Sequence, residues 1–165
     1  MKDRTSIEAT ASVSAYTTTV SWRRRDAVFS DNRYSREHTW TFDGGVVVPA
    51  SSSPHVVPIP LSNAANVDPE ESYVAAISSC HMLFFLGLAA ARTFVIDSYD
   101  DAAVGVMEKN ENGKMWMSRV TLRPKIVFSG TSLPSTADIN ALHHDSHAQC
   151  YIANSVKTEI VIQAA

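Results

Sequence analysis

Residues 68–92 have the sequence DPEESYVAAISSCHMLFFLGLAAAR and decide the fold of this 165-residue chain. Asp68 is a suitable helix N-cap, Pro69 suits the first helical position, and two glutamates follow at the positive end of the helix dipole. Residues 72–91 then contain no charged side chain. The segment predicts a helix from Asp68 to about Arg92 that is buried on all sides, in a core or between subunits.

Strand patterns precede this helix. Residues 13–22 and 38–42 are rich in Thr, Val and aromatic side chains, which favour strands. The turn Asp43-Gly44-Gly45 predicts a hairpin, with a return strand at 46–48. Residues 50–60 carry three serines and three prolines and predict a loop.

The pattern after the helix predicts a second hairpin, a second helix and a last strand. Strands are expected at 102–108 and 115–128 around a turn at 110–113, a helix at 136–150 capped by Ser135 or Thr136, and a strand at 156–162. Both tight turns join neighbouring strands, so we expect a single α+β domain, 1–165, with largely antiparallel sheets.

The composition excludes some classes of protein. Seventeen acidic against fourteen basic residues give a net charge of −3, which argues against a nucleic-acid binder. The polar residues within 72–91, and polar sequence on both sides, argue against a membrane span. Residues 1–8 are polar and charged and lack the apolar region of a secretory signal. Two cysteines without such a signal suggest a reducing compartment, and we expect a cytoplasmic protein.

Cys80 is the first candidate for chemistry. Burial alone raises the pKa of a thiol and leaves it inert, so a reactive Cys80 needs a positive partner. Its own helix has no basic residue before Arg92, which leaves Arg33, Arg36 and His81 as candidates. His81 points about 100° away around the helix and is a poor partner for its neighbour. The alternative is a buried Cys80 that acts only as a small apolar side chain.

A second candidate cluster lies in the helix predicted at 136–150. His143 and His147 are spaced i and i+4, and Cys150 follows three residues later. This spacing suits zinc, although a polar helix face and a redox role for Cys150 are alternatives. No phosphate-binding glycine loop or G-x-S-x-G elbow is present, so nucleotide cofactors gain no support.

These motifs together resemble the OsmC/Ohr family of thiol peroxidases. That family has an N-P-E-[EQ] helix start, A-A-x-x-[AS]-C on the same helix, and a later C-x-x-[SA]-N. The chain has DPEE at 68–71, AAISSC at 75–80 and CYIANS at 150–155. Asp68 in place of Asn, and a first hairpin of different length, depart from the family pattern.

The resemblance implies an OsmC-like fold, an intertwined homodimer with active sites at the subunit interface, and organic hydroperoxides as substrates, with no metal or haem. It implies that Cys80 is the peroxidatic cysteine and Cys150 the resolving cysteine. Glu70 matches the glutamate that holds the active-site arginine. Arg36 matches that arginine best, and Arg33 is the alternative.

The implied reaction is that of a cysteine-based peroxide reductase. The Cys80 thiolate attacks the peroxide, the alcohol leaves, and the Cys80 sulfenic acid condenses with Cys150 to a disulfide. An external dithiol, such as a lipoyl or thioredoxin-like protein, then reduces the disulfide. Two alternatives remain: an OsmC-fold protein without peroxidase activity that binds a small apolar ligand, and a Cys-His hydrolase, disfavoured because His81 is misdirected.

Helix geometry limits how Glu70 and Cys80 share one site. At about 1.5 Å per residue they lie about 15 Å apart on an intact helix. Three solutions follow: the helix breaks between them, an arginine spans the gap, or Glu70 comes from a second chain. The charge-free run at 72–91 favours the last, because an apolar helix needs cover on every side.

Overall fold

The computed structural model describes residues 13–164, and the segment 1–8 considered for a signal lies outside them. The chain divides into two compact units, Met1–Asn66 and Val67–Ala165. Each unit is described by itself below. The expectation of one domain over 1–165 stays a prediction.

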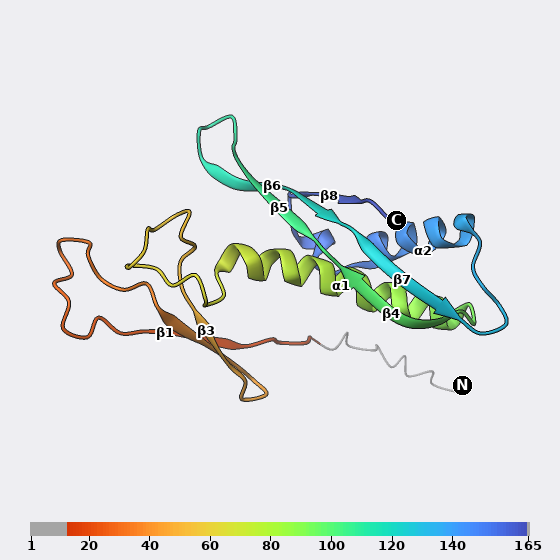
Figure 1. The fold of residues 1–165 in the computed structure, drawn as a ribbon, viewed down its shortest axis with the longest axis horizontal. Coiled ribbons are helices and arrows are strands. Elements are labelled where there is room, and N and C mark those ends of the chain that lie inside the picture. Colours follow the sequence, from red (N-terminus) through yellow and green to blue (C-terminus); the bar gives the residue numbers. More distant parts are fainter. Residues whose placement is uncertain (1–12, 165) are drawn as a thin grey trace, which may run out of the picture. The chain divides into compact units, whose positions relative to one another are not determined.

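The described part of the first unit is a three-stranded antiparallel sheet with loops (Figure 1). Its strands are β1 (Thr18–Trp22), β2 (His38–Phe42) and β3 (Val47–Ala50), in the order β1-β2-β3. The predicted hairpin at Asp43-Gly44-Gly45 is confirmed, and Gly45 has the positive φ of 83° that such a turn favours in glycine. The first strand is shorter than the predicted 13–22.

The second unit begins with α1 (Pro69–Ala91), as the sequence predicts. The Asp68 carboxylate accepts a hydrogen bond from the Glu71 backbone N–H at 2.8 Å, and the Glu71 carboxylate accepts one from the Asp68 N–H at 3.2 Å. This reciprocal capping box fixes where α1 starts. Among the described residues, α1 is the one helix whose length and apolar composition would allow it to cross a bilayer; core helices also meet that criterion.

The rest of the second unit supplies sheets and a second helix. β4 (Val95–Asp101) pairs with β7 (Pro124–Ser129), and β5 (Val104–Lys109) pairs with β6 (Met115–Leu122), both antiparallel. α2 (Thr136–Gln149) and the short 3-10 helix η1 (Ala153–Ser155) lead to β8 (Glu159–Ile162), which runs parallel to β6. The fold class is α+β with largely antiparallel sheets, as expected.

Two strand predictions differ from the structure. The sequence analysis missed β4, whose three aspartates make it a poor strand pattern. It also joined β6 and β7 into one strand at 115–128. The chain leaves the ladder between them because the Arg123 backbone N–H donates to the Asp101 carboxylate at 2.6 Å, and Pro124 has no N–H to donate. The Asp101 carboxylate of β4, the strand that was missed, therefore helps to separate strand β6 from strand β7.

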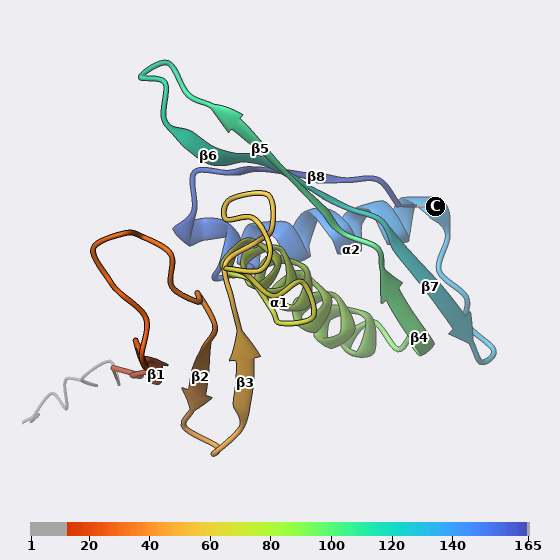
Figure 2. The same cartoon turned by 60° about the vertical axis from the view of Figure 1, so that its left-hand side comes forward.

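Within the second unit, the long antiparallel strands lie against α1, and α2 lies beside it (Figures 1 and 2). Two apolar clusters hold these layers together. Ile77 packs with Val120 and Leu122, while Phe85 and Ala89 pack with Leu142 of α2. The buried residues of α1 are spaced by four: Ile77, His81, Phe85 and Ala89.

Candidate functional site

The two cysteines lie together in the second unit but in different surroundings. Cys80 is half-buried on α1, and Cys150, which caps the end of α2, is 1% exposed. Both thiols are free. Burial raises the pKa of the Cys150 thiol, and the neighbouring Cys80 thiol raises it further. Cys150 is therefore a protonated, protected thiol beside a more accessible one.

Cys80 opens onto an apolar cavity of about 450 Å³. The cavity is formed by one face of α1 and by the two residues that follow Cys150. The residues that line it are Ala76, Ser79, Cys80, Leu83, Phe84, Tyr151 and Ile152. Cys150 does not line it, so a molecule in this cavity meets Cys80 first.

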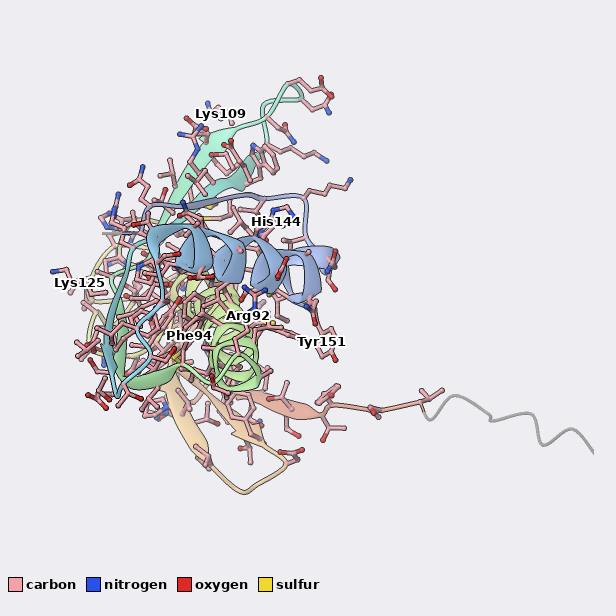
Figure 3. The ribbon with its side chains drawn as sticks, turned by 90° about the vertical axis from the view of Figure 1, so that its right-hand side faces the viewer. Arg92, Phe94, Lys109, Lys125, His144 and Tyr151 are labelled. Carbon is pink, nitrogen blue, oxygen red and sulfur yellow. The ribbon has the colours of Figure 1, made fainter. Side chains whose placement is uncertain are left out.

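Tyr151 forms one wall of this cavity, a role the sequence analysis missed. Its ring meets Phe84 edge-on, with centroids 5.0 Å apart and planes at 88°. Figure 3 shows Tyr151 beyond the end of α2. The only feature of the sequence that could have pointed to this role is the position of Tyr151 directly after a candidate resolving cysteine.

Glu70 lies at the start of α1 and lines a different cavity, of about 390 Å³. α1 is one unbroken helix from Pro69 to Ala91, so the possibility of a break between Glu70 and Cys80 is removed. An arginine that spans the gap, or a Glu70 from a second chain, are the solutions left.

Arg36 and Arg33 belong to the first unit, whereas both cysteines belong to the second. Arg36 is half-buried, and its guanidinium donates to the Asn32 side-chain oxygen at 2.7 Å and lies 3.8 Å from the centre of the Tyr34 ring. Arg33 is exposed. Of these two arginines, Arg36 is the one whose guanidinium is held by hydrogen bonds.

His81 lies on the buried face of α1, turned toward α2. Its Nε2 is 3.0 Å from His143 Nδ1, and the two ring planes are nearly parallel, with an interplanar angle of 11°. Burial lowers the pKa of both histidines, and that of His81 to about 4. The sequence analysis missed this pair, because no local pattern reports which α2 residue meets His81.

The structure does not assemble a metal site from the residues considered for zinc, which are His143, His147 and Cys150. His143 is buried against His81, whereas His147 is exposed. Within residues 13–164, no group of three or more His, Cys, Asp or Glu side chains lies close enough to hold a metal ion. His144 is also exposed on α2 (Figure 3).

Comparison with known proteins gives one family. The pattern of the OsmC family, described as OsmC-like protein, matches residues 62–165. An OsmC-like protein of unknown function from Vibrio cholerae is 53% identical, with a TM-score of 0.90, over 93% of this chain and 100% of that chain. The sequence matches no curated protein.

Organic hydroperoxide resistance proteins share the fold at low identity. The one from Elizabethkingia anophelis is 15% identical, with a TM-score of 0.67, over 94% of this chain and 96% of that chain. OhrB of Bacillus subtilis is 16% identical, with a TM-score of 0.62, over 92% of this chain and 98% of that chain.

The buried His81 predicts a loss of stability in mild acid. Its pKa is about 4 in the folded protein and near 6.5 in an unfolded chain. Between these values the unfolded chain binds a proton that the folded protein does not, so the free energy of unfolding falls as the pH decreases from 6.5 to 4. The loss from this residue is about 1.4 kcal/mol per pH unit at most and about 3 kcal/mol in total.

Urea unfolding of the wild type and of H81Q between pH 7 and pH 4 measures this loss. Glutamine does not titrate, so H81Q should lose less stability than the wild type across that window. His143 contributes in the same direction and remains in both proteins, so the difference reports His81 together with its hydrogen bond to His143. Equal slopes for both proteins would contradict the assignment.

Proposed function

Because this chain belongs to the OsmC-like family, we propose that it is a thiol-dependent peroxidase that reduces organic hydroperoxides to alcohols. The observation that carries the proposal is the pair of free cysteines, one open to an apolar cavity and one protected beside it. Relatives of this fold are named for organic hydroperoxide resistance, which supports a peroxidase-related role.

The surroundings of the two thiols support different roles. Cys80 lines the cavity and serves as the peroxidatic cysteine: its thiolate attacks one peroxide oxygen, the alcohol leaves, and a sulfenic acid forms. Cys150 is buried and protonated, so it is spared from the peroxide and attacks the sulfenic acid as the resolving cysteine. An external dithiol, of the lipoyl or thioredoxin-like kind, reduces the disulfide.

Arg36 and Glu70 complete the proposed site. Arg36 stabilises the Cys80 thiolate and orients the peroxide, because an arginine keeps its charge even where water is excluded. Glu70 holds the arginine. Arg36 is half-buried and its guanidinium is hydrogen-bonded, which favours it over the exposed Arg33. No metal or haem takes part in this mechanism.

The walls of the cavity favour apolar peroxides over hydrogen peroxide. Leu83, Phe84, Tyr151 and Ile152 present apolar surface beside Cys80. The same cavity suits the second candidate function, an OsmC-fold protein that binds a small apolar ligand without reducing peroxide. A reducing compartment such as the cytoplasm suits the first candidate, since it keeps both thiols reduced between cycles.

We further propose that the protein is a homodimer through α1. Only 22% of the most apolar stretch of this helix is buried within the chain. Its exposed face includes Ala76, Ser79, Leu83 (64% exposed) and Gly87, and a Cβ added at Gly87 meets nothing within 4 Å. A second copy that covers this face would also bring one Glu70 toward the Cys80 of its partner.

Peroxide treatment tests the reaction. Cumene hydroperoxide should be consumed in the presence of dithiothreitol and should leave a Cys80–Cys150 disulfide within one chain when no reductant is present. Mass spectrometry of non-reduced digests detects this disulfide. C80S should lose all peroxide consumption, whereas C150S should stop at the sulfenic acid.

Two free thiols after this treatment, with no peroxide consumed, would contradict the peroxidase proposal. Binding of an apolar fluorescent probe that is displaced by labelling Cys80 would then support the ligand-binding alternative.

The arginine assignment is tested by alkylation of Cys80 at neutral pH. R36A should slow the reaction of Cys80 with iodoacetamide by roughly tenfold or more, because an opposite charge favours the thiolate. R33A is the matched control and should change the rate little. If R33A is the slower variant, Arg33 takes the role and the mechanism is otherwise unchanged.

Light scattering at micromolar concentration tests the dimer and should report about twice 18.0 kDa. G87E should dissociate it, because the charged side chain has room within one chain but not under a packed partner. G44E, at another glycine with open space around its Cβ, is the matched control and should remain dimeric. A stable wild-type monomer that reduces peroxide would contradict the dimer.

A further inference from the structure

The two helices that carry the cysteines are joined by a buried hydrogen bond. His81 of α1 is 1% exposed and His143 of α2 is 5% exposed. Because burial lowers the pKa of both, both rings are neutral at pH 7. One proton therefore lies between His81 Nε2 and His143 Nδ1, and one ring donates while the other accepts at 3.0 Å.

This pair lies in a contact between α1 and α2 that is otherwise largely apolar. The His143 ring lies 4.5 Å from the ring of Phe85, which packs with the apolar residues that join α1 to α2. Its outer nitrogens, His81 Nδ1 and His143 Nε2, are buried and have no partner among the described residues. A buried polar atom without a partner costs about 1–3 kcal/mol, so two apolar residues of similar shape would hold this contact at least about as well. What the histidines add to the contact is a hydrogen bond, which is directional where apolar packing is not.

This directional hydrogen bond joins residues that lie near the two cysteines in the sequence. His81 follows Cys80 on α1, and His143 lies about two turns before Cys150 on α2. The apolar contact of Phe85 and Ala89 with Leu142 holds the helices together but does not by itself fix how far one slides along the other. The Arg92–Asp145 ion pair also joins these helices, at the C-terminal end of α1 and in partly exposed surroundings.

We propose that the His81–His143 hydrogen bond is a positioning contact for disulfide formation, holding Cys150 within reach of the oxidised Cys80. This inference rests on the proposed peroxidase function. In the step concerned, the Cys150 sulfur bonds to the Cys80 sulfur, the sulfur–oxygen bond of the sulfenic acid breaks, and the hydroxyl leaves with the thiol proton as water. The oxidising equivalents are already on Cys80, so no further oxidant is required.

A pair of substitutions at His143 separates the hydrogen bond from the packing. H143F fills the ring volume but has no nitrogen, so it removes the bond to His81. H143N places an amide near the former Nδ1 and can restore that bond. H143F should form the disulfide at least about tenfold more slowly than the wild type, and H143N should stay within about twofold of it.

Single-turnover reaction with cumene hydroperoxide measures both steps. Trapping with dimedone reports the sulfenic acid, and the mass of the intact protein after acid quench reports the disulfide. In H143F the sulfenic acid should form at the wild-type rate and then accumulate. D145N, which removes the charge from the Arg92–Asp145 ion pair between α1 and α2, is the matched control and should form the disulfide at the wild-type rate.

A second oxidant keeps this inference distinct from the peroxidase proposal. Diamide oxidises two adjacent thiols directly and is itself reduced to the hydrazine, so it reports cysteine positions without peroxidase chemistry. H143F should again be slow and H143N should again recover. If the wild type fails with peroxide but the variants differ with diamide, the proposed function is wrong and the positioning role holds.

Three results would overturn the positioning role: equal disulfide rates in H143F and the wild type, equal slowing of both chemical steps in H143F, or equal slowing by D145N. If H143F does not fold, H81L/H143L replaces both partners by apolar residues and takes its place. The same slow disulfide step is expected in that variant.

Discussion

The need to cover one long apolar helix determines most of this structure. α1 carries no charged side chain between Ser72 and Ala91, so exposing this helix to water would cost much free energy. Sheets β4–β8 and helix α2 cover the face that carries Ile77, His81, Phe85 and Ala89. The opposite face, with Leu83 and Gly87, is exposed within the chain. The covered face forms the core, and a second chain that covers α1 would have to pack on the exposed face.

The same helix separates the two thiols by their access to solvent. Cys80 lies at the border between the buried and exposed faces of α1 and therefore opens to a cavity. Cys150 comes from the end of α2, on the buried side, and its pKa is raised. In a two-cysteine reaction one thiol must meet the oxidant and the other must avoid it. Helix geometry alone supplies that asymmetry.

Local patterns in the sequence predicted those features that depend on local physics. The capping residue Asp68, the hairpin at Gly45 and the start of α2 at Ser135 are all found, because caps and turns depend on a few adjacent residues. The strand β4 and the break at Arg123 were missed, because Asp97 and Asp101 are stabilised there by partners distant in sequence. The His81–His143 contact was missed for the same reason: it joins residues from two helices.

The fold and the chemistry of this family therefore place different demands on the chain. The fold requires α1, its cap and its apolar cover, all of which lie in the second unit. A reactive Cys80 additionally requires a positive charge, and α1 has no basic residue before Arg92 to provide one. The charge has to come from elsewhere, and Arg36, held by Asn32 and Tyr34, is the residue proposed for it. A relative that lost this arginine would keep the helix, both cysteines and the cavity, and would still pass for a peroxidase by fold.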